Sequence, residues 1–459
     1  MKILQIVALW LCTATMFGWC QSGAAPLTAK QPFVEPVTVI HEWLGESPGD
    51  QFGWIARVIG DVDADGCNDF VTSAPTRKNG GDNAGRVYVY SGRSGALLWK
   101  VDGAPGDQLG SGIEAAGDVN GDGIADVIAS APEIDSAYLY SGRDGRTLRT
   151  LHGEKPGDHF GEHVASVGDL DGDGYADVIV GAPGNNAGGK GAGRAYVYSG
   201  KSGQVLLTLT GERSGDAFGS TVAGYSDARS HFVVVGAPGA GARKTGRVYV
   251  YSGLATQPRF MIDADSTGVA LGYMFVAVLG DVDGDGVPDI FASDWSDASL
   301  GPRTGKTYVY SGRTGQHLYT FSGQTAGEGF GTTHSVAGDI NGDDRADLII
   351  GSWQYSAVAP GAGRAYLYDG RTEKLLRTYT SRIPGETFGF DAVGIGEQDE
   401  HGQAELLITS GWSNIRGPHS GRIFLITTGL PVPAAPQARI PEADWLPGWP
   451  HPSGYRGAI

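Results

Sequence analysis

Acidic residues recur in this sequence at a spacing suited to binding a hard metal ion. Within residues 168–183, carboxylates occupy positions 1, 3, 5 and 9 of one loop, namely Asp169, Asp171, Asp173 and Asp177. Calcium prefers six to eight oxygen ligands at about 2.3–2.6 Å, and alternate residues of a tight loop can direct several carboxylates at one centre. Gly174 at position 6 permits the positive φ of a sharp turn. The spacing therefore predicts a calcium-binding loop, here called an Asp loop.

The Asp loop occurs five times, which argues against simple Asp-Gly turns. A turn alone needs one Asp or Asn beside a glycine and not four spaced oxygens. Position 7 is expected to contribute its backbone carbonyl, so its side chain is free to vary. The predicted ligands of about five Ca²⁺ ions are Asp61, Asp63, Asp65, Cys67 and Asp69; Asp118, Asn120, Asp122, Ile124 and Asp126; Asp169, Asp171, Asp173, Tyr175 and Asp177; Asp281, Asp283, Asp285, Val287 and Asp289; and Asp339, Asn341, Asp343, Arg345 and Asp347.

Two further units have lost this set of carboxylates. Residues 224–231 read Gly-Tyr-Ser-Asp-Ala-Arg-Ser-His and cannot supply the ligands. In the last unit the aligned residues are Glu397, Asp399, His401 and Glu405. A histidine at position 5 is a poor ligand for so hard an ion. We expect both loops to lack calcium.

The loops belong to a repeated unit of about 51 to 59 residues that is counted between Phe-Gly or Leu-Gly pairs. Seven such pairs begin at Phe52, Leu109, Phe160, Phe218, Leu271, Phe330 and Phe388. Each unit predicts a short strand A before the Asp loop, strand B after it, strand C, a Ser-Gly-x-x-Gly turn and strand D. Four short strands at this period predict an all-β fold, a seven-bladed β-propeller of four-stranded antiparallel blades.

The two ends of the repeat array predict how the ring closes. The seventh unit lacks strand D, whereas residues 37–45 resemble a strand D and precede the first unit. We expect this N-terminal strand to complete the last blade, because closure removes an unpaired sheet edge. The predicted organisation is a signal peptide at 1–24, a linker at 25–36, the propeller at 37–429 with repeats near 45–102, 103–152, 153–210, 211–263, 264–322, 323–380 and 381–429, and a Pro-rich tail at 430–459.

These motifs carry a family resemblance. Phe160-Gly161, the Asp loop that follows and Gly181-Ala182-Pro183 resemble the FG-GAP repeat of integrin α subunits and of many exported bacterial proteins. The resemblance covers about residues 37–429. It implies a seven-bladed propeller with calcium-bearing hairpin loops and a role in adhesion or extracellular binding.

Charge and the N-terminal segment indicate the compartment. A formal charge of −17 without a basic stripe argues against a nucleic-acid partner. The apolar run at residues 3–17, followed by Ser22-Gly23-Ala24, resembles a secretory signal peptide and is shorter than a membrane-spanning helix. We expect a secreted or cell-surface protein without an integral membrane span after signal removal; a lipoprotein ending the signal at Cys20 is the alternative. Cys67 then remains as the single cysteine, so no intramolecular disulfide is expected.

Three tryptophans suggest a ligand-binding patch. Trp295, Trp353 and Trp412, with Tyr355 nearby, replace the proline of Gly-Ala-Pro in three consecutive units. Strand direction places them on the face that carries the variable B–C loops, where binding usually resides. Large aromatic side chains suit protein or glycan partners. Alternatively, each tryptophan packs against its neighbouring Phe-Gly turn.

The sequence favours a secreted calcium-binding propeller that acts as an extracellular binding or adhesion module for a protein or glycan. A polysaccharide lyase or hydrolase, and a structural cell-surface module, are the alternatives. No catalytic constellation in the sequence supports an enzyme. The run from His159 to His163 matches His-x-x-Glu-His of zinc peptidases but lies at a strand start and not in a helix.

Overall fold

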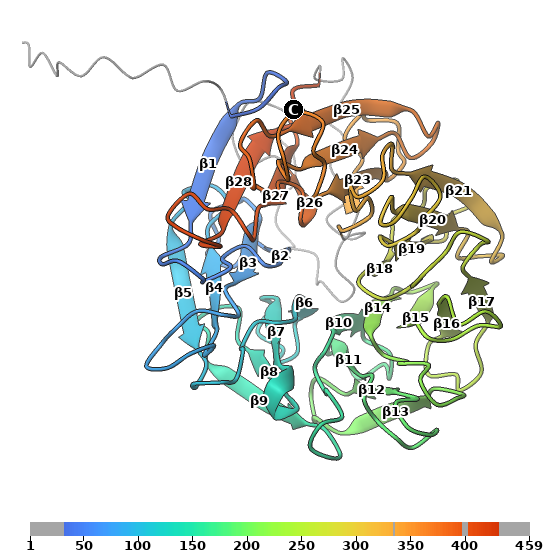
Figure 1. The fold of residues 1–459 in the computed structure, drawn as a ribbon. Coiled ribbons are helices and arrows are strands. Elements are labelled where there is room, and N and C mark those ends of the chain that lie inside the picture. Colours follow the sequence, from blue (N-terminus) through green and yellow to red (C-terminus); the bar gives the residue numbers. More distant parts are fainter. Residues whose placement is uncertain (1–31, 334–335, 397–402, 431–459) are drawn as a thin grey trace, which may run out of the picture. The chain divides into compact units, whose positions relative to one another are not determined.

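The computed structural model describes residues 32–333, 336–396 and 403–430. The described residues of the compact unit that begins at Phe33 form seven four-stranded sheets and one short 3₁₀ helix, η1 (Pro132–Ile134). Figure 1 shows the sheets as blades around a common centre. The all-β prediction and the seven-bladed propeller are confirmed. The predicted signal peptide, the linker up to residue 31 and the tail from residue 431 lie outside the described residues.

Every pairing within a blade is antiparallel, and strands A to D run from the centre of the ring outward. The strands of blades 1 to 4 are β2 (Ala56–Gly60), β3 (Asp69–Ser73), β4 (Arg86–Tyr90) and β5 (Leu97–Asp102); β6 (Ile113–Gly117), β7 (Asp126–Ala131), β8 (Ser136–Tyr140) and β9 (Thr147–His152); β10 (Val164–Gly168), β11 (Asp177–Ala182), β12 (Arg194–Tyr198) and β13 (Val205–Thr210); and β14 (Thr221–Ser226), β15 (His231–Ala237), β16 (Arg247–Ser252) and β17 (Phe260–Asp263). Those of blades 5 to 7 are β18 (Val276–Val278), β19 (Ile290–Asp294), β20 (Lys306–Tyr310) and β21 (His317–Ser322); β22 (Val336–Gly338), β23 (Asp347–Ser352), β24 (Arg364–Tyr368) and β25 (Leu375–Thr380); and β26 (Ala392–Gly396), β27 (Glu405–Thr409), β28 (Arg422–Thr427) and β1 (Val39–Leu44).

Burial explains the composition of these strands. Strand B of each blade is covered by both neighbouring blades, so β7 and β11 are buried at every position and read as runs of small and apolar residues. Strand D lies at the rim, and β5 and β13 alternate between exposed and buried side chains. The hydrophobic core is therefore divided into clusters that lie between adjacent blades.

The Phe-Gly pairs seat one blade on the next. Phe218 is buried, and its backbone forms a parallel bridge with Gly193 of blade 3. Gly193 has a φ of +83°, and a Cβ there would lie 2.1 Å from the carbonyl oxygen of Phe218. Only glycine fits so close an approach at this φ. This contact explains why six of the seven blades carry a glycine ahead of strand C. In blade 2 the residue there is Asp135, which has a φ of +50°.

The ring closes as the sequence predicts. β1 pairs with β28, so the N-terminal strand is the outermost strand of blade 7. Trp43 of β1 packs edge-on against Phe70 of blade 1 and donates its indole N–H to the carbonyl of Gly95 at 2.9 Å. Phe33, within the predicted linker, is buried between Phe388 and Phe424. The packed chain thus begins at least four residues before the predicted start of the propeller.

A buried ion pair network joins the same blades near the axis. Arg57 of β2 donates from Nε to Glu114 of β6 at 2.9 Å, and its Nη1 pairs with Asp391, immediately before β26. Arg57 and Asp391 are both buried. Asp391 also accepts the backbone N–H of Ala56 at 3.2 Å. Blades 7, 1 and 2 are therefore linked at the inner strands as well as at the rim.

Replacing Arg57 by alanine should destabilise the protein by about 3–5 kcal/mol, because it leaves the Asp391 carboxylate buried without its cation. The combined change of Arg57→Leu, Glu114→Gln and Asp391→Asn should recover most of that loss, since no charge then remains buried. Denaturant unfolding measures both, with exposed Arg146→Ala as the control. Equal stabilities of Arg57→Ala and the control would contradict the inner link.

Candidate calcium loops and the opposite face

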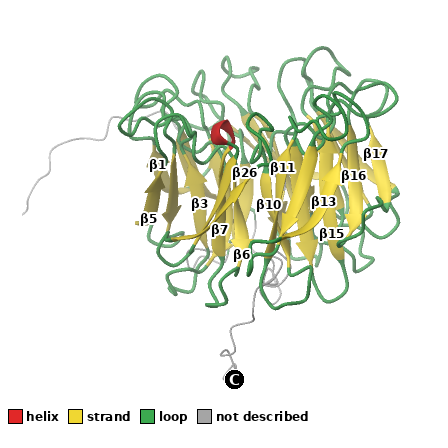
Figure 2. Ribbon diagram, turned by 90° about the horizontal axis from the view of Figure 1, so that it is seen from below, coloured by secondary structure: helices red, strands yellow, loops and turns green. Residues whose placement is uncertain are grey.

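The two faces of the propeller carry different loops. The A–B loops and C–D turns share one face, which we call the Asp-loop face. The B–C loops and the D–A loops share the other, called the B–C face. η1 lies in the B–C loop of blade 2 and is the red element at the upper side of Figure 2. The blade topology therefore separates the candidate metal sites from the variable loops.

Backbone donors give the Asp loop its shape. In blade 3, the position 1 carboxylate of Asp169 accepts N–H groups from Gly172 at 2.7 Å, Asp173 at 3.1 Å and Gly174 at 2.8 Å. Asp173 at position 5 accepts the N–H of Tyr175 at 3.0 Å. Position 5 makes the same bond to position 7 in the other loops, to Cys67, Ile124, Val287 and Arg345. These bonds turn the loop back on itself, so its carboxylates converge.

The carboxylate at position 9 ties the loop to the rest of its blade. Asp177 is fully buried and accepts N–H groups from Leu170 at 2.9 Å and from Gly200 of the C–D turn at 3.1 Å. Burial raises its pKa to about 7, and the neighbouring Asp171 and Asp169 add to the increase. The equivalent carboxyls, whose pKa burial likewise raises to about 7, are Asp69, Asp126, Asp289 and Asp347. A nearby cation would favour the charged form of these carboxyl groups.

The donor sets fit a hard cation. Carboxylate oxygens of three residues lie within 4.8 Å of one another at positions 1, 3 and 9 in the first and third loops, and at positions 1, 3 and 5 in the loop of blade 5. In blade 6, Asn341 donates its amide N–H to Asp347 at 3.3 Å, while its buried Oδ1 has no hydrogen-bond partner among the described residues. An amide oxygen left in this position is a suitable calcium ligand.

The fourth and seventh loops differ. β14 and β15 are joined by residues 227–230, where Asp227 accepts the N–H of Arg229 at 2.7 Å in a tight turn. This hairpin offers one carboxylate. In blade 7, Glu397, Asp399 and His401 lie outside the described residues, and Glu405 is buried at the start of β27.

The three tryptophans do not form one patch of equivalent residues. Trp353 is 7% exposed and its ring contacts Trp412 at 4.7 Å and Phe390 at 5.6 Å between centroids. Tyr355 is buried beneath the guanidinium of Arg364, 3.8 Å from its ring. The indole nitrogens of Trp295, Trp353 and Trp412 are buried without a hydrogen-bond partner among the described residues. Trp353 therefore serves mainly to pack blades together.

The register also corrects one repeat alignment. The N–H of Gly363 binds the carbonyl of Tyr355, and the N–H of Gly421 binds that of Ser413 in the same way. Ser413 is thus equivalent to Tyr355, so Gly411, and not Trp412, occupies the position of Trp353. The indole of Trp412 therefore lies one residue further along the loop than that of Trp353, where it stacks on His419.

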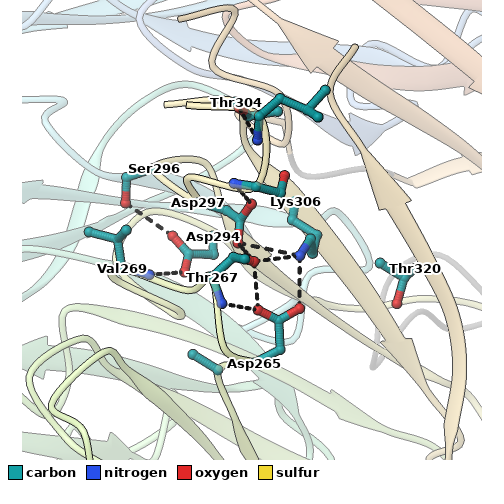
Figure 3. Close-up of polar contacts among 12 residues, drawn as sticks. Asp265, Thr267, Val269, Asp294, Ser296, Asp297, Thr304, Lys306 and Thr320 are labelled. Atoms are coloured by element: carbon teal, nitrogen blue, oxygen red, sulfur yellow. Dashed lines mark hydrogen bonds and ion pairs between the residues drawn. The ribbon is translucent and has the colours of Figure 1, made fainter. Parts of the chain in front are cut away.

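A polar network in blade 5 was not apparent in the sequence. Figure 3 shows Lys306 donating to Asp265 at 2.8 Å and to Thr267 at 2.7 Å, with Asp297 3.4 Å away. Buried Asp294 accepts the backbone N–H of Val269 at 2.7 Å. The network joins the D–A loop to the base of the B–C loop at residues 295–305. The only sequence signal was the replacement of Ala in Gly-Ala-Pro by Asp294.

Exposed apolar side chains gather on the loops of consecutive blades. Leu300, Val358 and Ile415 lie in the B–C loops of blades 5, 6 and 7 and are 61%, 42% and 48% exposed. Tyr273, beside the Leu-Gly turn of blade 5, is 47% exposed. These four residues, here called the apolar tips, were not singled out from the sequence because isolated apolar residues in loops carry no periodic signal. Their clustering on one face follows only from the fold.

Comparisons with known proteins agree with this architecture. FG-GAP repeats match residues 52–90, 112–143 and 160–198, and an FG-GAP-like repeat matches residues 281–350. Together with the seven blades, these matches identify the chain as an integrin-α-like FG-GAP propeller.

The matched relatives are integrin α chains. The chain is 32% identical over 175 residues to integrin alpha-6 of Gallus gallus, which covers 35% of this chain and 16% of the relative. It is 34% identical over 163 residues to integrin alpha-4 of Xenopus laevis, covering 32% and 16%. It is 30% identical over 173 residues to integrin alpha-PS5 of Drosophila melanogaster, covering 33% and 17%. The matches thus span about a sixth of these relatives. Within the described residues, the structure contains no helix of the length and apolarity that crossing a membrane requires.

Trp353→Ala should destabilise the fold by about 3–5 kcal/mol, as expected for a buried aromatic side chain, because it opens a cavity beside Trp412 and Phe390. Leu300→Ala, at an exposed tip, should change stability by less than about 0.5 kcal/mol. Thermal and urea unfolding of the two variants provides the comparison. A Trp353→Ala protein as stable as Leu300→Ala would contradict this packing role.

Proposed function

We propose that this chain is a secreted, calcium-binding propeller that acts as an extracellular binding or adhesion module for a protein partner. The observation that carries the proposal is the fivefold Asp loop, whose carboxylates converge on one side of a closed propeller. The resemblance to integrin α chains supports a binding or adhesion role in general terms.

The metal assignment follows from the ligand chemistry. Carboxylate, amide and backbone carbonyl oxygens are ligands for calcium, and the loops contribute neither thiolate nor imidazole from positions 1, 3, 5 and 9. Calcium would compensate the charge of buried position 9 carboxylates such as Asp177 and stabilise the bond between loop and C–D turn. We therefore propose a stabilising role for the metal, with one ion in each of the five loops.

The B–C face of blades 5 to 7 is the proposed partner-binding surface. Its apolar tips are exposed, whereas Trp353 is buried against Trp412 and Phe390. Lys306 fixes the base of the blade 5 loop through Asp265 and Thr267. A rigid base with exposed apolar tips suits protein recognition, in which a few desolvated side chains supply most of the affinity. The binding experiment described below includes glycans, so it also tests a glycan partner.

We propose no catalytic role. Arg57 and Asp391 lie at the inner strands, where an enzyme of this architecture would be expected to collect catalytic groups, but they are engaged in the buried ion pair network. His163, in the same region, is partly buried, and desolvation together with the nearby charge of Arg57 lowers the pKa of its imidazole to about 3. These groups are placed to link blades and not to meet a substrate.

Calcium titration should detect about five ions per chain, and chelation should lower the melting temperature because the sites exist only in the folded state. Asp169→Ala, which removes position 1 in blade 3, should reduce the stoichiometry by one. Asp227→Ala, in the short hairpin of blade 4, is the matched control and should leave it unchanged. Calorimetry showing no calcium uptake would reject the metal assignment, and six or seven ions would show that the fourth or seventh loop binds.

Changing Leu300, Val358 and Ile415 together to aspartate should weaken partner binding by at least about tenfold, since the tips would lose apolar contact and gain charge. Leu97, Val205 and Leu375, which are 44%, 50% and 46% exposed, begin strands at the Asp-loop face, and the same three changes there form the control. The measurement is binding to an array of extracellular proteins and glycans in calcium. Equal loss in both variants would remove the B–C face as the binding surface.

A further inference from the structure

The C–D turns contain a basic residue wherever the blade contains an Asp loop. Directly after the Gly of the turn stand Arg93, Arg143, Lys201, Arg313 and Arg371 in the five blades with complete loops. In blade 4, whose loop has lost its carboxylates, the same position is Leu254. Blade 7 has β1 in place of a continuous strand D and hence no such turn. The repeats within this one chain therefore associate the basic residue with the acidic loop.

The structure places these cations beside position 5 of the loop. Arg313 lies 3.0 Å from Oδ2 of Asp285, and Arg143 lies 3.4 Å from Oδ2 of Asp122. Lys201 lies 3.8 Å from Oδ2 of Asp173 in blade 3. The other oxygen of each of these carboxylates accepts the N–H of position 7. The basic side chain therefore contacts the carboxylate oxygen that is left free by the loop backbone.

The remaining two blades follow the same arrangement with different contacts. In blade 1, Nε of Arg93 lies 3.2 Å from Sγ of Cys67 at position 7. In blade 6, Arg371 is near enough to Asp343 at position 5 to attract its carboxylate electrostatically. A second cation reaches the loop of blade 5 from its neighbour, since Arg345 lies 3.9 Å from Asp281 and its guanidinium packs over Gly284. Positive charge is thus present at each of the five loops.

Charge balance indicates what these side chains do. Four carboxylates within one loop repel one another, and a cation near position 5 reduces that repulsion when no metal is present. A bound divalent ion would perform the same task more strongly and would repel the neighbouring ammonium or guanidinium group. Calcium and the basic side chain therefore compete for one oxygen of the position 5 carboxylate.

We propose that the basic residue of each C–D turn is an internal counter-ion, which holds its Asp loop in shape without calcium and gives way when calcium binds. The inference rests on the proposed calcium sites. It implies that the propeller stays folded at low calcium and that its affinity for calcium is set below what the carboxylates alone would provide. Leu254 fits this account, because a loop without clustered carboxylates needs no counter-ion.

The test replaces Arg93, Arg143, Lys201, Arg313 and Arg371 together with glutamine. The control replaces five exposed basic residues away from the Asp loops, which gives the same net charge: Lys155, Lys190, Arg229, Lys244 and Arg303. In chelator, the test variant should melt about 1–6 °C below the control, because three exposed ion pairs and the positive charge beside the other two loops are lost. In calorimetric titration, its mean calcium affinity should exceed that of the control by about two- to fivefold per site.

Two results would overturn the proposal. In one, the test variant and the control melt alike in chelator. In the other, the test variant binds calcium more weakly than the control, which would make the basic residues positioning groups for the bound metal. Failure of the proposed function is recognised separately, because the unchanged protein would then take up no calcium at all. The melting comparison in chelator still decides the counter-ion role in that case.

Discussion

Each blade with an Asp loop depends on a buried carboxylate at the start of strand B. In blade 3, Asp177 receives one N–H from its own loop and one from Gly200 at the far end of strand C. A single side chain thus holds two turns of the Asp-loop face together. The desolvation of its charge is unfavourable, as its raised pKa of about 7 shows. The cation that we propose among the surrounding loop carboxylates would offset this desolvation cost.

The repeated features could be predicted from the sequence because the same residues recur at the same positions in several of the seven units. The Phe-Gly pairs, the Asp loops and the missing strand D of the last unit together predicted the blade count and the pairing of β1 with β28. Contacts that occur once could not be predicted. Arg57 and Asp391 are 334 residues apart, and neither shows a pattern that would connect them.

The candidate ligand face shows the same limit. A tryptophan in place of proline suggested a surface patch. In the closed ring, however, Trp353 packs against Phe390 and Trp412, so most of its surface is buried within the protein. Side-chain type indicated a large contact surface and could not say whether the contact lies within the protein. The apolar tips at Leu300, Val358 and Ile415 gained significance only when three loops proved to be neighbours. We propose that the repeated loops of the Asp-loop face stabilise each blade and that the variable loops of the B–C face serve recognition.

Amide hydrogen exchange with and without calcium tests the central claim most directly. The amides that donate to position 9 belong to Gly92, Gly142, Gly200, Gly312 and Gly370. The amide of Gly253 in blade 4 donates instead to the backbone carbonyl of His231. The account predicts that calcium slows exchange at the five amides and leaves Gly253 unchanged. Exchange that is insensitive to calcium, or slowed equally at Gly253, would contradict a metal that acts through the position 9 carboxylate.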